Sequence, residues 1–562
     1  MKEVYIYMGA FLLILIFFAI RVHFAKKEET EKLRKRIKRS WGNVPNREYE
    51  TKEFELIPFY YKKTKGEGYT VDDITWNDLN MDNIYMLMNH SQTSIGDEYL
   101  YKMLRCPQEN SDLLNENEVY INYFEENNDK AWDIQEKFAR IGRTKNISLY
   151  EYINRLTEVK KGSNIAHYFC IALFIASIAL FCIEPAIGIL VLMITAGINV
   201  ISYFSYKAKI ESYFLCVKYL VNIINIGEAI EITVKDKELI PLIEKIGKLS
   251  KELKTIRKGI FWLTSSSMSG SIIDVFMDYV RMFLHVDIIK FNSVLQMTVQ
   301  KMDVIDELYE NIGRLETCIS IASFRKMLPY YSKPEFVNEK KCSISFEEIY
   351  HPSIEGAVVN DLKESKCVLI TGSNASGKST FLKTVAINAI LAQTINTCTA
   401  SSYSGNFFEI YSSMALRDDL ESNESYYIVE IKSLKRILDN ISEDKHILCF
   451  VDEVLRGTNT VERIAASSRI LKNFAENNVM CFAATHDIEL THILEDYYSN
   501  YHFEEELEDN NILFNYKLFK GRATSRNAIK LLGIIGYDEK IISDAEKAAG
   551  DFLNNGNWTK CY

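Results

Sequence analysis

The chain has 562 residues, a formal charge of −10 and a hydrophobic fraction of 47%. This length is too great for one ordinary hydrophobic core and predicts two or three structural units. The acidic balance argues against a protein that coats nucleic acid through bulk charge, although a local basic face stays compatible with it. The 11 cysteines include no CxxC pair. This favours reduced thiols in a cytosolic compartment over a disulfide framework or a structural zinc site.

The first apolar run covers Val4 to Ile20 and is followed by a dense basic cluster between Arg21 and Arg39. A cleavable secretory signal, the alternative interpretation, has its positive charge before the apolar run and a small-residue cleavage site after it. The order is reversed here, so we interpret residues 1–22 as an uncleaved transmembrane anchor and residues 23–74 as a basic juxtamembrane linker. The positive-inside rule then places the N-terminus outside and the following chain in the cytoplasm.

Two further uncharged runs, Ile165 to Ile183 and Ala186 to Phe204, are separated only by Glu184 and Pro185. Each run suits the thickness of a bilayer core, and residues 165–204 predict a transmembrane helical hairpin. Lysines flank the hairpin on both sides, so both of its ends are expected in the cytoplasm. The predicted location is therefore the cell membrane, with three spans, lipid as a partner and the soluble regions cytoplasmic. A hairpin buried inside a soluble protein is the alternative.

The cytoplasmic regions before the last third of the chain are expected to be mainly helical. Arg47 to Thr64 lacks a clear period and predicts a short, extended stretch. Residues 75–164 form the first helical part, with helical spacing clearest over 81–104, and residues 205–338 form the second part, interrupted at Pro241. Apolar stripes in such segments more often serve internal packing than ligand binding.

From Cys342 onward, short apolar runs alternate with helical segments. The runs are CVLIT at 367–371, HILCFVDE at 446–453 and VMCFAAT at 479–485. Buried parallel strands have such uninterrupted apolar sequences. Residues 339–535 therefore predict an α/β domain.

A loop within this domain matches the pattern GxxxxGK[ST], directly after the first strand and directly before a helix. Glycines let such a loop turn its backbone N–H groups toward phosphates, while Lys378 supplies charge to the β and γ groups and Ser379 offers a hydroxyl to Mg²⁺. The sequence therefore predicts a P-loop ATPase with ATP and Mg²⁺ as cofactors. The loop residues expected to bind the nucleotide are Gly372, Ser373, Asn374, Ala375, Ser376, Gly377, Lys378, Ser379 and Thr380.

Two acidic residues end the second strand, and a histidine ends the third. Asp452 is expected to hold Mg²⁺ through its water shell, and Glu453 to polarise the attacking water as a general base. A solvated strand end is the alternative explanation for such an acidic pair. His486 falls at the carboxyl edge of the sheet, where ligands of open α/β sheets bind, and can sense the γ-phosphate. The predicted catalytic residues are Glu453, Lys378 and His486, and the predicted metal ligands are Ser379 and Asp452.

Three motifs of the chain resemble the ATPase domain of the MutS mismatch-repair family. They are TGSNASGKST at 371–380, VDEVLRGTNT at 451–460 and ATHDIEL at 484–490. The resemblance implies an α/β P-loop (ABC/MutS-like) ATPase domain that follows an all-α lever-type region carrying the transmembrane helices. In that family a serine reaches the nucleotide of the partner subunit, and Ser425 matches its position. The segment YKLFKGRATSRNAIKLLGIIGYDEKIISDAEK at 516–547 resembles the family's C-terminal helical dimerisation element. The resemblance implies dimerisation helices in residues 536–562 and a homodimer with two composite ATP sites.

The chain departs from the family pattern in two respects. The stretch between residues 22 and 75 is too short for the mismatch-recognition domain, and membrane spans are foreign to enzymes that slide on DNA. We therefore predict a membrane-anchored MutS-like ATPase that couples ATP binding and hydrolysis to movement of helical arms. DNA is a candidate partner, and no small-molecule substrate beyond ATP is indicated.

Two alternatives remain at this stage. The first is a mismatch-repair or recombination factor that binds mismatched or branched DNA. The second is an ABC-type transporter ATPase, against which the segment ESNES stands where an LSGGQ-like segment would lie.

Overall fold

The structure is a computed structural model, and it divides into two compact units. The first unit comprises Met1–Gly66, Met88–Lys102 and Asn117–Met327, and the second comprises Glu67–Leu87, Met103–Glu116 and Leu328–Tyr562. The described residues are 17, 21, 24–25, 27–144, 147–158, 162–257, 272–373, 376–414, 426–456, 458–508, 511–523, 529, 532, 535–556, 558 and 560. Apart from Phe17, the apolar run of the predicted N-terminal anchor lies outside them, as do Asn374, Ala375 and Ser425.

The second unit is built on a six-stranded sheet with the strand order β10-β9-β4-β8-β7-β6. The strands are β4 (Cys367–Thr371), β6 (Glu409–Ser413), β7 (Ile447–Asp452), β8 (Val479–Ala484), β9 (Tyr498–Glu508) and β10 (Asn511–Lys520). Neighbours pair in parallel except β9 and β10, which form an antiparallel hairpin. The three strands predicted from apolar runs are present as β4, β7 and β8, with bounds that agree to within one residue.

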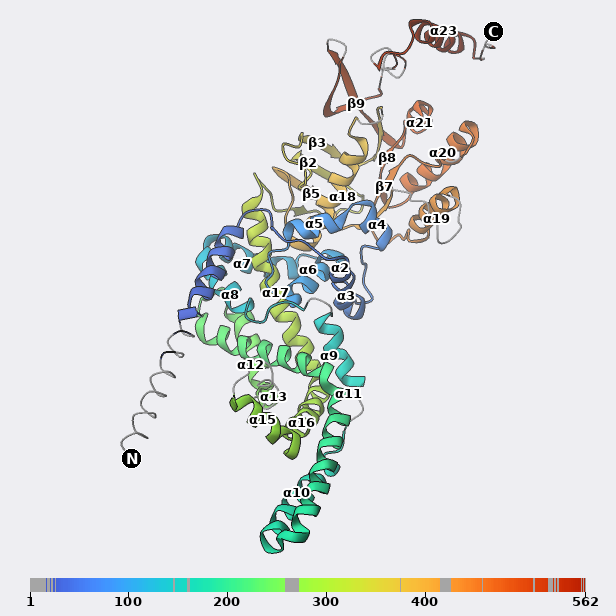
Figure 1. Cartoon of the computed structure of the whole chain (residues 1–562). Coiled ribbons are helices and arrows are strands. Elements are labelled where there is room, and N and C mark those ends of the chain that lie inside the picture. The colour runs from blue at the N-terminus through green and yellow to red at the C-terminus, as the bar shows by residue number, and fades with distance from the viewer. Residues whose placement is uncertain are drawn as a thin grey trace. The chain divides into compact units, whose positions relative to one another are not determined.

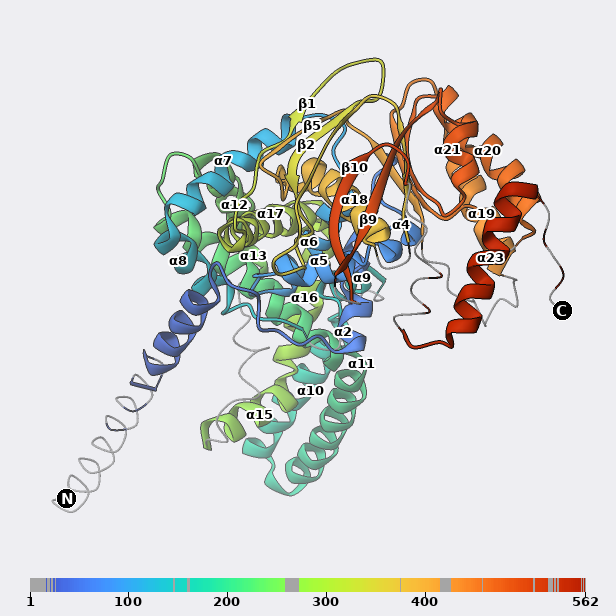
Figure 2. The same ribbon diagram turned by 90° about the horizontal axis from the view of Figure 1, so that it is seen from above.

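Helices cover both faces of this sheet (Figures 1 and 2). They are α18 (Lys378–Ile395), α19 (Tyr426–Asp439), α20 (Thr460–Glu476) and α21 (Ile488–Ile493). Cys367 of β4 shares one buried core with Leu434 of α19, Phe474 of α20 and Leu490 of α21, so these three helices lie on one face and α18 lies on the other. Because β4, β7 and β8 are buried on both faces, their sequences are apolar except for Thr371 and Asp452 at the ends of β4 and β7.

A smaller sheet and two early helices complete this unit, together with the C-terminal helix α23 (Glu539–Asn555). The four-stranded sheet has the order β1-β5-β2-β3, with β1 (Glu335–Phe336), β2 (Ile344–Ile349), β3 (Asn360–Glu364) and β5 (Ser402–Gly405). The early helices are α4 (Asp73–Asp78) and α5 (Met81–Met88). Asp78 accepts hydrogen bonds from Ser412 Oγ at 2.7 Å and from the Met414 amide at 2.9 Å. The chain around α4, which precedes the hairpin in sequence, therefore packs on the edge strand β6.

The described part of the first unit is helical. Its helices are α2 (Thr51–Leu56), α3 (Phe59–Thr64), α8 (Asn128–Phe138), α9 (Leu149–Glu158), α10 (Ile165–Ile183), α11 (Pro185–Thr233), α12 (Ile240–Glu252), α13 (Lys254–Arg257), α15 (Ile272–Leu284), α16 (Val286–Gln300) and α17 (Met302–Met327). Helices α6 (Ser94–Arg105) and α7 (Asp112–Glu126) contribute residues to both units. Pro241 lies in the first turn of α12, where a backbone N–H has no partner within the helix, so the missing N–H of proline costs no hydrogen bond. Pro241 therefore marks the start of α12, which is separate from α11.

The prediction of an extended stretch from Arg47 to Thr64 is wrong, because α2 and α3 occupy most of it. Each helix has only six residues and little intrinsic stability. Packing supplies what the local sequence lacks, since the buried Tyr60 ring lies within 4.7 Å of Tyr150 and 5.1 Å of Tyr309, measured between ring centroids. Such tertiary contacts leave no signal in a short window of sequence.

The predicted hairpin is present as α10 and α11, which join at Glu184 and Pro185. In Figure 1 the hairpin extends away from the other helices of its unit. Within an apolar stretch of 18 residues, only 11% of the residues in α10 and 17% of those in Pro185–Glu211 are buried, and both segments are long and apolar enough to cross a membrane. Helix α11 continues far beyond Phe204, however, through a third apolar segment, Tyr213–Thr233, which also meets this criterion but is 50% buried. That segment packs against α12 and α9 and forms part of the helical core.

A buried ion pair ties α17 to α7 within the first unit. Arg325 is 1% exposed and donates to both oxygens of Glu118, at 2.9 and 2.7 Å, and to Glu125 at 3.2 Å. We expect Arg325→Met to destabilise the unit by about 3 kcal/mol, because the Glu118 carboxylate would stay buried without its partner. Thermal unfolding followed by circular dichroism measures this loss.

The matched control is Arg155→Met, which removes an exposed ion pair with Glu151 one helical turn away. Such surface pairs contribute about 0.5 kcal/mol or less. Equal effects of the two substitutions would contradict a structural role for the Arg325 pair.

Candidate functional site

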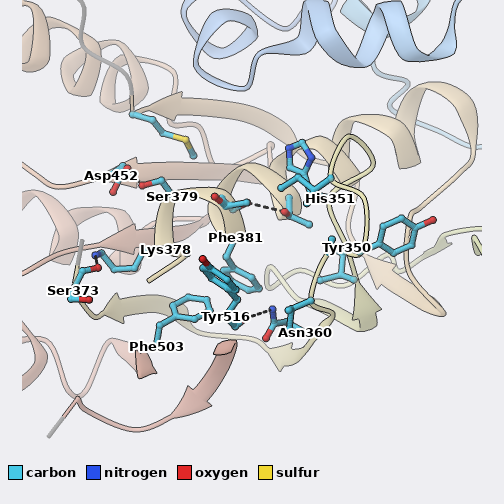
Figure 3. A pocket seen from close by; sticks show the side chains of 18 of the residues that line it. Tyr350, His351, Asn360, Ser373, Lys378, Ser379, Phe381, Asp452, Phe503 and Tyr516 are labelled. Atoms are coloured by element: carbon cyan, nitrogen blue, oxygen red, sulfur yellow. Dashed lines mark hydrogen bonds between the residues drawn. The ribbon is translucent and has the colours of Figure 1, made fainter. Parts of the chain in front are cut away.

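The site is a cavity of about 960 Å³ within the second unit, a volume in the range of small-molecule pockets. Its walls come from the β4–α18 loop, the end of β7, the segment between β2 and β3, and the β9–β10 hairpin. Figure 3 shows Lys378, Ser379 and Asp452 together toward one end of the cavity and Tyr350 and His351 toward the other. Charged groups therefore gather where the parallel strands end.

Two glycines shape the loop between β4 and α18. Gly372 has a φ of +150° and Gly377 a φ of +106°, values that side-chain-bearing residues rarely adopt. A Cβ atom at Gly372 would lie 2.9 Å from Ser376 Oγ, and one at Gly377 would lie 3.1 Å from a ring carbon of Tyr516. The loop therefore needs glycine at both positions.

Lys378 starts α18 and folds back onto the loop. Its Nζ donates to the backbone oxygens of Gly372 at 2.8 Å and Ser373 at 2.7 Å. Burial lowers the pKa of Lys378, although the nearby carboxylates of Asp452 and Glu453 oppose this shift. Among the described residues, the hydrogen-bond partners of the ammonium are these two loop carbonyl groups, which it can exchange for an anionic ligand.

Ser379 and Asp452 form the second pair of the site. Ser379 Oγ donates to Asp452 Oδ2 at 2.5 Å, and Asp452 is only 7% exposed. Hydroxyl and carboxylate oxygens are the hard ligands that Mg²⁺ prefers, so this donor set fits the predicted metal. The buried Ser376 Oγ has no hydrogen-bond partner among the described residues, which leaves one further polar group facing the loop interior.

Glu453 lies directly beyond β7 and has both carboxylate oxygens engaged. His486 Nε2 lies 2.8 Å from Oε1, and Arg456 Nε donates to Oε2 at 2.7 Å. The hydrogen bond from His486, helped by Arg456, lowers the pKa of Glu453, so the carboxylate is ionised at neutral pH. Glu453 also adopts a φ of +59°, and its amide donates to the Ala484 carbonyl at 2.9 Å. This contact brings the ends of β7 and β8, and with them Glu453 and His486, together.

A second ion pair fixes the segment that carries His486. Arg463 of α20 forms two hydrogen bonds with the carboxylate of Asp487, at 2.9 and 2.5 Å. The Asp487 amide also donates to Thr485 Oγ1 at 3.0 Å. Asp487, the residue after His486, is therefore held by the Arg463 side chain and by the Thr485 hydroxyl.

The β9–β10 hairpin supplies an aromatic wall. Tyr516 lies at an irregularity of the β9–β10 pairing and has a φ of +53°. Its carbonyl accepts a hydrogen bond from Asn360 Nδ2 at 3.1 Å, and its side chain is 45% exposed beside the loop glycine Gly377. Ile354 and Val358, which are also exposed, line the same cavity. These groups form an apolar surface next to the charged end.

His351 lies at the far end of the cavity from the loop (Figure 3). Burial, with a smaller contribution from the positive charge of Lys383, lowers the pKa of His351 to about 4. The imidazole is therefore neutral at pH 7, and its Nδ1 accepts a hydrogen bond from the Ser353 amide at 3.2 Å.

The structure brings together most of the residues singled out in the sequence. Lys378, Ser379, Asp452 and Glu453 line one cavity, and His486 contacts Glu453. The described loop residues Gly372, Ser373, Ser376, Gly377 and Thr380 lie beside them. Asn374, Ala375 and Ser425 fall outside the described residues.

Sequence reasoning missed Arg456 and Tyr516. Arg456 follows Glu453 by three residues within a motif already quoted, so its position was a signal. Tyr516 lies far along the chain, and only the fold of the β9–β10 hairpin places it at the loop.

The fold and this site define a mixed α/β domain with a ligand cavity at the carboxyl end of its parallel strands. Residues 368–552 match the family model for MutS domain V. Human "MutS protein homolog 4" is 30% identical over 302 residues, which cover 47% of this chain and 32% of that protein. "DNA mismatch repair protein MutS" of Methanosarcina barkeri is 29% identical over 273 residues, covering 46% of this chain and 30% of that protein. The protein of the same name from Pseudothermotoga lettingae is 30% identical over 267 residues, covering 45% and 32% respectively.

Residues 368–552 therefore belong to a MutS family ATPase domain. The predicted family is confirmed for this part of the protein, and the mainly helical region before it fits a MutS-like domain architecture. The chain spans about a third of the length of the curated relatives that it matches.

Proposed function

We propose that the protein is a membrane-anchored MutS-like ATPase that couples ATP binding and Mg²⁺-dependent hydrolysis to movement of its helical arms. The observation that carries this proposal is the convergence of Lys378, Ser379, Asp452 and Glu453 on one cavity of a MutS family domain. The two apolar helices of the hairpin support the membrane part of the proposal.

Within this proposal, each group of the site has a separate task. Mg²⁺, when bound, would neutralise phosphate charge, and Ser379 and Asp452 are the residues that would hold it. Lys378 exchanges the loop carbonyls for the phosphates. Glu453 exchanges one of its two side-chain partners for a water molecule and accepts its proton as general base. His486 and Arg456 orient the Glu453 carboxylate until that exchange.

The aromatic wall gives the base of the nucleotide a place to bind. The half-exposed ring of Tyr516 offers a stacking surface, and Ile354 and Val358 offer apolar contacts nearby. The neutral His351 adds a polar group at the far end of the cavity. We infer that adenine binds against Tyr516, Ile354 and Val358 within this cavity.

We further propose a homodimer in which Ser425 of each subunit reaches the nucleotide of the other. The resemblance of residues 516–547 to a dimerisation element motivates this arrangement, and the hairpin would leave both ATPase domains in the cytoplasm. Membrane lipid is then a direct partner. ATP hydrolysis by the purified protein should require Mg²⁺ and should cease when the metal is chelated.

A DNA-binding repair factor is the second candidate function, because two of the relatives quoted above carry the name "DNA mismatch repair protein MutS". The match to MutS domain V favours both of these proposals over an ABC-type transporter.

A filter-binding titration with homoduplex, mismatched and branched DNA across salt concentrations separates the two functions. We expect weak binding that falls with salt and shows no preference for mismatches, because a net charge of −10 opposes extensive phosphate contact. A strong preference for mismatched or branched DNA would favour the repair factor. Absence of binding to all three would remove DNA as a partner.

A further inference from the structure

The last two turns of helix α15 (Ile272–Leu284), whose side chains are described from Asp278 onward, combine an exposed tyrosine with a buried arginine. Tyr279 is 55% exposed, whereas Arg281 is 1% exposed. A surface helix of a soluble protein turns its aromatic residues inward and its charges outward. The side of α15 that carries Tyr279 therefore faces surroundings that suit an aromatic ring better than they suit a charge.

Arg281 faces the protein, whereas the side chain of its partner Asp278 is 57% exposed. Arg281 Nη1 donates to Asp278 Oδ1 at 2.7 Å, and its charge also acts on Asp287 at the start of α16. Asp287 Oδ2 accepts a hydrogen bond from Tyr203 of α11 at 2.8 Å. Arg281, Asp287 and Tyr203 are thus buried between α15, α16 and the hairpin helix α11.

The C-terminal end of α15 is attached to the hairpin at a defined level. The ring of Phe283 stacks on Phe174 of α10 with centroids 5.0 Å apart, and Nδ1 of His285 lies 2.9 Å from Nδ1 of His167. Phe174 lies roughly 14 Å along α10 from its first residue, at a rise of about 1.5 Å per residue. Since a hydrocarbon core is about 30 Å thick, this level falls within the leaflet at which the hairpin enters.

Exposed aromatic residues continue from α15 onto the hairpin at the same end. Tyr168 and Phe169 of α10 are 56% and 64% exposed. Figures 1 and 2 both show α15 directing one end toward the hairpin and the rest of its length away from it. Aromatic residues are enriched where a membrane protein passes from headgroups to acyl chains.

We propose that α15 is an interfacial membrane helix whose Tyr279 face lies in the cytoplasmic leaflet beside the hairpin, while Arg281 faces the protein. This inference rests on the proposed membrane hairpin and adds a second element that touches lipid. Amphipathic helices of this kind lie in the membrane plane with their apolar side buried at the headgroup and acyl boundary. The bilayer would then contact the protein over a broader base than two helices provide.

Photo-crosslinking of the full-length protein in vesicles of phosphatidylethanolamine and phosphatidylglycerol tests this proposal. Benzoylphenylalanine replaces Tyr279 in one variant, Leu190 of the hairpin in a second and Ile232 near the end of α11 in a third. All three positions are exposed, at 55%, 58% and 71%. After irradiation, lipid adducts are measured by mass spectrometry of the intact protein.

We expect adducts at Tyr279 and Leu190, several-fold above the level at Ile232. Adducts at Leu190 alone would overturn the proposal for α15 while leaving the membrane hairpin in place. A crosslink from position 279 to a second copy of the chain would overturn it too, because that face would then be a protein interface. Absence of adducts at Leu190 would refute the hairpin itself, so the two failures are distinguishable.

Discussion

Replacing Glu453 by Gln is expected to lower ATP turnover by about 10²–10⁴-fold, the usual contribution of a general base. Glutamine keeps the shape of the side chain but cannot take a proton from water at neutral pH. Nucleotide affinity should change little, because Lys378 and Ser379 remain in place beside the loop. Phosphate release with Mg²⁺ and binding of a fluorescent ATP analogue measure the two properties separately.

Lys378→Ala should instead weaken binding and turnover together, since it removes the positive charge that we assign to the phosphates. Glu476→Gln is the matched control for both variants. Glu476 lies on α20 of the same domain, pairs with Lys472 and is far along the helix from the cavity. Unchanged turnover in Glu453→Gln would place the base elsewhere, and an equal loss in Glu476→Gln would indicate damage to the fold.

The fold of the ATPase domain could be predicted from the sequence because its central strands are buried on both faces. Burial of Cys367–Thr371, Ile447–Asp452 and Val479–Ala484 favours apolar residues at all but the last positions, which produces runs with clear ends. The candidate site residues could also be predicted, because Asp452 ends β7, Glu453 follows it and His486 lies two residues beyond β8.

What the sequence did not reveal depends on contacts between distant segments. The engagement of both Glu453 oxygens requires the end of β8 and the turn after β7 to meet. Tyr516 reaches Gly377 only through the irregular pairing of β9 with β10. Helix α3 likewise depends on packing by Tyr60 and Tyr61, which are buried although the local sequence has no helical period.

The length of α11 illustrates a different limit. Hydropathy identified the hairpin, but it does not distinguish a helix surface that faces lipid from one that faces protein. Tyr213–Thr233 is apolar enough to cross a membrane and yet is half buried among the other helices of its unit. Exposure in the folded chain therefore decides which apolar segments remain candidates for the bilayer, and it selects α10 and the first part of α11.

A variant without residues 1–22 is expected to stay in the membrane fraction after a carbonate wash, because α10 and Pro185–Glu211 of α11 are exposed, apolar and long enough to span a bilayer. A second variant also lacks residues 1–22 and carries, in place of residues 165–204, a Gly/Ser linker of about four residues, which spans roughly 11 Å. Such a linker suffices because the two ends of the hairpin are close, with the rings of His167 and Tyr206 4.9 Å apart. We expect this second variant in the supernatant.

Its ATP turnover should persist, since every residue that we assign to catalysis lies in the second unit and the hairpin lies in the first. Turnover also reports folding, so a soluble and active variant would show that the hairpin serves attachment and not assembly of the site. A third variant that keeps residues 1–22 and lacks only the hairpin isolates the predicted N-terminal anchor and should remain in the pellet. Release of the first variant into the supernatant would contradict a membrane role for the hairpin, whatever the third variant does.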